Sequence, residues 1–116
     1  LAYSPLAQGY ITGKYLDGAR PEGARTTLFN RGQRYETPHA EKIIKKYMQL
    51  ANEYHLDPAL MALAFVNQQE FVTSNIIGAT NMDQLEVAIK SFSTTLSKEL
   101  IEKINLIHLE CPNPCP

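Results

Sequence analysis

The chain has 116 residues, with 44% hydrophobic and 20% charged side chains and a formal net charge of −1. This composition is typical of one globular domain with a modest core. The near-neutral charge gives no general attraction to nucleic acid or to a membrane surface. No apolar run approaches the roughly 18 residues that would cross a bilayer. We therefore expect neither nucleic acid nor membrane as a partner.

The first four residues, Leu-Ala-Tyr-Ser, are typical of a short buried strand that ends at Ser4–Pro5. Because this strand starts without any lead-in, we expect the sequence to be part of a longer one. Residues 5–37 are rich in glycine and show little periodicity, which predicts a long loop. A loop of that length is usually functional. It also carries all four arginines, whose planar charged fork suits phosphate, although a solvated basic loop is the alternative.

Residues 38–55 have apolar side chains at helical spacing, which predicts an amphipathic helix. Asp57 and Pro58 begin a second helix as its N-cap and first residue. The body of this second helix, residues 60–66, is apolar on nearly every side and is therefore expected to be buried.

The segment 71–80 contains the β-branched residues Val72, Ile76 and Ile77 and ends at Gly78-Ala79, which predicts a second strand over 71–80. Thr80 or Asn81 can cap the helix that follows at about 82–92. The side chains expected to be buried from that helix are Leu85, Ala88, Ile89 and Phe92. Ser97 is expected to cap a last helix ending near residue 109, with an apolar stripe formed by Leu100, Ile101, Ile104 and Ile107.

The element order is therefore strand, loop, two helices, strand and two helices, and helical crossovers between strands imply a parallel pair. Two strands cannot make a stable parallel sheet covered on both faces. The sequence thus predicts an α/β fold that is part of a larger sheet. In such folds ligands bind at the carboxyl ends of the strands.

Two loops follow the ends of the two strands. The first has the sequence YSPLAQG and continues to GKY at residues 13–15, and the second is IGATNMDQL at residues 77–85. A turn of small residues that opens a helix presents backbone N–H groups to an anion. Taken alone, each loop is more typical of an ordinary tight turn.

Taken together, AYSPLAQG, TGKY, DPALMALAFV, SNIIGATNMDQLE and IHLECPNPCP resemble the last quarter of the aldo-keto reductases along essentially the whole chain. The resemblance is closest to the Tas-like branch and extends to the potassium-channel beta subunits. It implies that residues 1–116 are the C-terminal part, with the last two strands and flanking helices, of a (β/α)8 TIM barrel. Such barrels need about 250 residues, so this chain alone cannot close one.

The resemblance also implies NADP(H) as the cofactor and positions for its contacts. Tyr3 matches the ring that stacks on the nicotinamide. Lys14 and, less directly, Arg25 match basic residues near the phosphates. The loop over the pyrophosphate is matched by Ser4, Pro5, Leu6, Ala7 and Gln8, and the second phosphate and adenosine loop by Gly78, Thr80 and Gln84.

One departure from the family pattern follows the second loop. The family usually has an acidic or polar residue and then Asn, both contacting adenine, where this chain has Val87 and Ala88. We therefore expect weakened adenine contacts.

The resemblance implies that residues 1–4 are the seventh strand of the barrel and residues 74–79 the eighth. The Tyr, Lys, Asp and His that transfer protons in the family precede the seventh strand, so no residue of this chain is predicted to be catalytic. His39, His55 and His108 are interpreted as helix-terminus residues. The parent protein is expected to reduce a small carbonyl compound, an aldehyde or ketone, by hydride transfer. A nicotinamide-binding regulatory subunit and an inactive truncated product are the alternatives.

Cys111 and Cys115 lie in a proline-rich tail. A Cys-x3-Cys pair needs two further metal ligands, and His108 alone does not complete a set. We predict no metal site, and we expect reduced thiols in a cytoplasmic protein.

Overall fold

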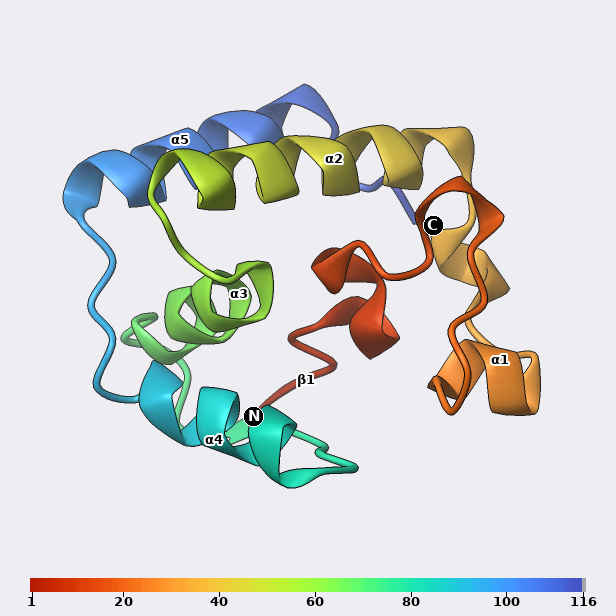
Figure 1. Ribbon diagram of the computed structural model, residues 1–116. Coiled ribbons are helices and arrows are strands. Elements are labelled where there is room, and N and C mark those ends of the chain that lie inside the picture. The colour runs from red at the N-terminus through yellow and green to blue at the C-terminus, as the bar shows by residue number, and fades with distance from the viewer. Residues whose placement is uncertain (116) are drawn as a thin grey trace.

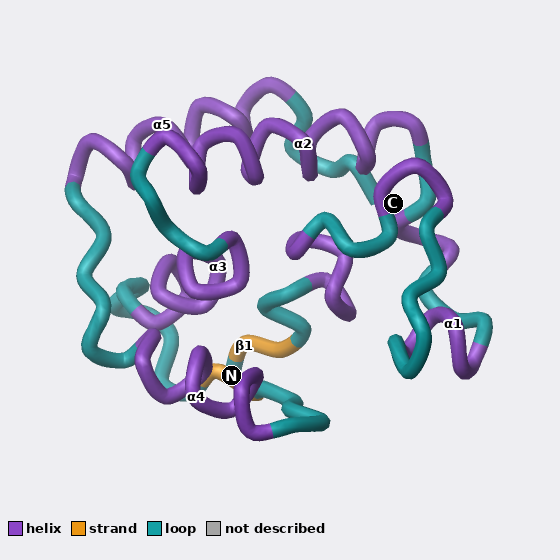
Figure 2. Tube along the Cα trace, viewed as in Figure 1, coloured by secondary structure: helices purple, strands orange, loops and turns teal. Residues whose placement is uncertain are grey.

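The computed structural model describes residues 1–115, in which two short parallel strands are surrounded by helices (Figures 1 and 2). The strands are β1 (Ala2–Tyr3) and β2 (Asn75–Ile76). The α-helices are α1 (Arg25–Phe29), α2 (Pro38–Glu53), α3 (Pro58–Asn67), α4 (Met82–Ser91) and α5 (Lys98–Glu110). Three 3-10 helices lie at Ala7–Thr12, Leu16–Gly18 and Gln33–Tyr35.

Each of the four long helices begins at a side chain that accepts a hydrogen bond from a backbone N–H of the first turn, which satisfies one of the free donors there. The predicted caps Asp57 and Ser97 are confirmed, and of the two candidates before α4 it is Asn81 that acts. Thr37 caps α2.

The two strands pair in parallel, as predicted, with Ala2 opposite Asn75 and Tyr3 opposite Ile76. Each strand is only two residues long, which is shorter than the predicted 1–4 and 74–79. Within residues 1–115 the two strands pair only with each other, so no third strand extends the ladder. The chain is thus an α/β fold with a minimal sheet.

The main core lies between α2, α3 and α5, which Figure 1 shows with α2 and α5 running side by side above α3. The predicted burial of α3 is confirmed by Met61 and Ala64, at 2% and 0% exposed. The other buried members of the core are Leu50, Ala51, Leu96, Leu100 and Ile104.

For α4 the burial prediction was wrong at two positions. Ala88 is buried and Leu85 is half-buried, but Ile89 and Phe92 are 62% and 72% exposed. The apolar spacing of α4 was interpreted correctly as one face of a helix, but in this chain only part of that face has an element to pack against.

The prediction of an irregular loop at 5–37 was also wrong in part. The segment contains α1 and the three 3-10 helices, and it packs around a second cluster formed by Tyr10, Tyr15 and Ile44. Short helices of this kind leave no 3.6-residue repeat in the sequence, so periodicity could not predict them. Within residues 1–115, no helix combines the length and the apolar character that crossing a membrane requires.

Candidate functional site

The two predicted loops leave adjacent strands at the same edge of the sheet. Tyr3 pairs with Ile76, so the loop that begins at Ser4 and the loop that begins at Ile77 start side by side. In Figure 1, β1 runs toward the right of the view, and both α1 and the loop before α4 lie on that side. The parallel pairing therefore brings together the starting points of the two predicted loops, which we call the first arm and the second arm.

The first loop has an unusual backbone. Ser4, Ala7 and Gln8 all have positive φ, at 54°, 48° and 57°. Residues other than glycine seldom adopt this left-handed backbone conformation, and those that do cluster at ligand clamps and active sites. Tyr3 is 80% exposed, so its ring is free to contact a ligand. Pro5 and Leu6 are half-buried and anchor the loop between these positions.

Lys14 lies back over the first loop. Its Nζ is 5.3 Å from the centre of the Tyr15 ring. A Cβ built on Gly9 would lie 2.7 Å from Lys14 Cε and 3.0 Å from Lys14 Nζ. Glycine at position 9 therefore allows the ammonium group to rest against the backbone of the predicted pyrophosphate loop.

The second loop is internally bonded. Gln84 Oε1 accepts hydrogen bonds from the Thr80 N–H at 2.9 Å and from the Thr80 hydroxyl at 3.1 Å. The Gln84 N–H in turn donates to Asn81 Oδ1. Gly78 is exposed, and a Cβ there would meet nothing within 4 Å. Gly78 and Thr80 thus lie in the loop and Gln84 in the first turn of α4, and the donors of Thr80 already have an acceptor in Gln84.

Arg25 is the first residue of α1 and is exposed. Among residues 1–115 its guanidinium makes no hydrogen bond or ion pair, so it is available to an anion, and it is not bonded to either loop. Arg34 is exposed and donates to the Cys115 carbonyl at 3.1 Å. Thr37 Oγ1 donates to the Pro114 carbonyl, so the tail docks on this segment.

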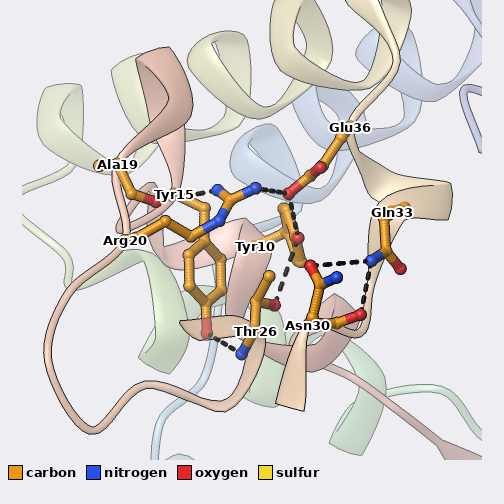
Figure 3. Close-up of polar contacts among 8 residues, drawn as sticks. All are labelled: Tyr10, Tyr15, Ala19, Arg20, Thr26, Asn30, Gln33 and Glu36. Atoms are coloured by element: carbon orange, nitrogen blue, oxygen red, sulfur yellow. Dashed lines mark hydrogen bonds and ion pairs between the residues drawn. The ribbon is translucent and has the colours of Figure 1, made fainter. Parts of the chain in front are cut away.

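A polar network inside the 5–37 segment was not foreseen from the sequence (Figure 3). Glu36 Oε1 accepts from Arg20 Nη2 at 2.6 Å and from the Tyr10 hydroxyl at 2.7 Å. Thr26 donates its hydroxyl to Tyr10 Oη and its N–H to Tyr15 Oη. Burial is the main cause that raises the pKa of Tyr10, and the hydrogen bond to Glu36 adds to it. Three tyrosines in a glycine-rich segment, at positions 10, 15 and 35, were the available signal.

The network borders a cavity of about 180 Å3, whose walls include Tyr10, Tyr15, Arg20, Glu36 and Glu41. Small-molecule sites typically occupy about 300–1,000 Å3, so this cavity is too small for a dinucleotide. The predicted cofactor contacts do not line this cavity, and the candidate site is the open surface at the strand ends where the two loops begin. No cluster of three potential metal-ligating side chains occurs in the part of the chain that the structure describes.

The family model for the "Aldo/keto reductase family" matches residues 1–108. "Protein tas" of Escherichia coli K12 is 47% identical over 116 residues, which is the whole of this chain and 34% of that protein. L-glyceraldehyde 3-phosphate reductase of the same strain is 32% identical over 109 residues, 88% of this chain and 31% of that protein. A protein named "Probable voltage-gated potassium channel subunit beta" from Arabidopsis thaliana is 30% identical over 110 residues, 90% of this chain and 34% of that protein.

The chain spans about a third of the length of these relatives. The match nevertheless includes both loops, the helices between them and most of the last helix, α5. The parallel strand pair with helical crossovers agrees with this match. The chain therefore belongs to the aldo/keto reductase family.

Proposed function

We propose that this chain forms the C-terminal part of the (β/α)8 barrel of an NADP(H)-dependent oxidoreductase and supplies two arms of its cofactor site. The observation that supports the proposal is the adjacency of the two arms. One leaves β1 after Tyr3 and the other leaves β2 after Ile76, at the strand ends where parallel α/β folds bind ligands.

The chemistry of the available groups suits a dinucleotide. The exposed Tyr3 ring offers a face for offset stacking on a nicotinamide. Lys14 and Arg25 supply positive charge for the phosphates, and the Ser4–Gln8 backbone supplies a loop with three residues in the left-handed region. Gly78 leaves its backbone open to close approach by a ligand. When bound, the reduced nicotinamide would supply the hydride for a small carbonyl substrate.

The residues of this chain position the cofactor and do not transfer the proton. The ring of Tyr3 is assigned to stacking and Lys14 to phosphate, while His108 lies in the last turn of α5, where a cation suits the helix dipole. We therefore expect this chain by itself to bind NADPH weakly and to reduce no aldehyde or ketone. Val87 and Ala88 lower the expected affinity further, because neither side chain can hydrogen-bond to adenine.

Titration of NADPH into the purified chain, followed by nicotinamide fluorescence, tests the proposal. Lys14→Gln and Arg25→Gln should each weaken binding by about ten-fold, because a charge-assisted contact is worth about 1.5–3 kcal/mol before solvent screening. Lys98→Gln is the matched control, since Lys98 is exposed on α5, outside both loops. NADH, which lacks the 2'-phosphate, should bind less tightly. Equal binding by all four proteins would contradict the proposal, and NADPH consumption with an aldehyde would contradict the assignment of proton transfer.

The second candidate function is a nicotinamide-binding regulatory subunit. The relative named as a channel beta subunit favours it, because that sequence matches 90% of this chain. A parent protein that binds NADPH but reduces no carbonyl compound would support this candidate over the enzyme.

A further inference from the structure

We propose that Arg20, Glu36, Tyr10 and Thr26 form a polar latch that holds the segment 17–29 in place and so positions Arg25 for the nucleotide. The link to the nucleotide rests on the proposed function, but the holding of the segment does not. None of the four residues matches a cofactor position of the family resemblance, and all four lie between β1 and α2.

One oxygen atom closes the latch. Glu36 Oε1 accepts from Arg20 Nη2 and from the Tyr10 hydroxyl, at 2.6 Å and 2.7 Å, and so ties residues that are 16 and 26 positions away (Figure 3). The side chains of Arg20 and Glu36 are 39% and 30% exposed, so water screens the pair only in part. A single charged acceptor with two donors makes stronger hydrogen bonds than neutral groups do.

The latch reaches Arg25 through its neighbour. Thr26 is 2% exposed, and its hydroxyl lies 3.3 Å from Tyr10 Oη while its N–H donates to Tyr15 Oη at 3.2 Å. Because Thr26 is fixed on both its backbone and its side chain, the Cα of Arg25 is fixed as well. The guanidinium of Arg25 remains in solvent, where an anion can reach it.

The close packing requires glycine at position 32, where φ is +110°. A Cβ there would lie 2.8 Å from Tyr10 Cε2 and 3.1 Å from Thr26 Oγ1. The backbone of Gly32 therefore forms the back wall of the latch.

Outside the latch the segment is weakly held. The pair between Asp17 and Lys45, at 3.2 Å, has side chains that are 80% and 50% exposed, and such pairs contribute little. Gly18 and Gly23 have positive φ and open space around them, so either can act as a hinge. Breaking the latch should therefore release residues 17–25 while α2 and the main core stay folded.

Trypsin cleavage of the Arg25–Thr26 bond tests the latch, because that bond can enter a protease only when Thr26 leaves its buried position. Glu36→Gln keeps an oxygen for Tyr10 but loses the charge that faces Arg20. It should raise the initial cleavage rate at this bond about five-fold and weaken NADPH binding by a similar factor, equivalent to about 1 kcal/mol. Mass spectrometry of the released peptides identifies the bond that is cut.

Glu22→Gln is the matched control, because Glu22 is an exposed carboxylate of the same segment and makes no ion pair among residues 1–115. Arg20→Gln is a second variant at an exposed position, and it removes no cleavage site because trypsin does not cut before Pro21. Arg20→Lys restores the charge and should recover part of the protection. Unchanged circular dichroism shows that each variant is folded.

Equal cleavage rates for Glu36→Gln, Arg20→Gln and Glu22→Gln would overturn the latch. Faster cleavage with unchanged NADPH affinity would overturn the positioning of Arg25 while leaving the latch in place. If the unmodified chain binds no NADPH, the proposed function fails and its link to the latch fails with it. In that case the cleavage rates still decide whether the latch holds the segment.

Discussion

Replacing Gly13 with alanine should destabilise the chain by about 1.5–2 kcal/mol, and the structure separates this cost into two parts. Gly13 has φ +79°, which costs an L-residue about 1–2 kcal/mol, partly offset by about 0.4–1 kcal/mol because alanine restricts the unfolded chain. A Cβ at this position would also overlap the sulfur of Met48 on α2. Because the overlap meets the flexible end of a half-buried side chain that can move aside, it should add about 1 kcal/mol, the low end of the range for overpacking.

Gly18 supplies the control for the backbone part. Its φ is +76°, almost the same as that of Gly13, but nothing lies within 4 Å of the position of its Cβ. Gly18→Ala should therefore cost only about 0.5–1 kcal/mol. In a Met48→Ala background the contact is absent, and Gly13→Ala should then cost the same as Gly18→Ala.

Urea unfolding followed by circular dichroism gives the free energy of unfolding for each variant. The reasoning is refuted if Gly13→Ala and Gly18→Ala cost the same in the unmodified background, because the overlap with Met48 would then have no energetic consequence. An unchanged cost of Gly13→Ala after Met48→Ala would refute it equally.

Three further changes have expected outcomes. Ser91→Ala should cost about 1–3 kcal/mol in urea unfolding, because Ser91 is 1% exposed and its hydroxyl accepts from Asn67 Nδ2, which would lose its partner. Phe92→Lys should reduce the concentration-dependent association of copies of this chain in sedimentation experiments, since the ring is 72% exposed. It should change the free energy of unfolding by less than about 0.5 kcal/mol. Association identical to that of the unmodified chain would contradict this prediction. The hydrogen bond from Lys46 is the main cause that lowers the pKa of Glu110 below the ordinary 4.5. The stability that the ionised Glu110 contributes is therefore complete above pH 4.5 and is lost as the pH falls through the lowered pKa. Glu110→Gln should flatten the pH dependence of the free energy of unfolding in that acidic range and leave the pH dependence near neutrality unchanged.

The parts of the fold that the sequence predicted well are those with local physical causes. Asp57 followed by Pro58, and Ser97 before an apolar stripe, start helices because the cap and the first turn lie within four residues of each other. The exposure of Ile89 and Phe92 could not be predicted in this way. Helical spacing shows which side chains share a face, but it does not show whether another element covers that face.

The same distinction between local and long-range causes explains which parts of the candidate site could be predicted from the sequence. The adjacency of the two arms followed from the order of strands and helices, because parallel strands end at one edge. The hydrogen bond between Tyr10 and Glu36 joins residues 26 positions apart in a segment without periodicity. No local rule pairs such residues, so the latch becomes visible only when the chain is folded.

The two arms differ in how ready they are for a phosphate. The first arm already holds Ser4, Ala7 and Gln8 in the left-handed region, so the backbone cost of that conformation is met before any ligand arrives. In the second arm Gln84 Oε1 occupies both donors of Thr80, and a phosphate would have to displace that oxygen before it gained those hydrogen bonds. Under the proposed function, the net gain at the second arm is the difference between two similar hydrogen-bond sets and is therefore small. Most of the phosphate affinity should therefore come from the first arm and from the guanidinium of Arg25. Because the latch sets the position of Arg25, it should control part of that affinity.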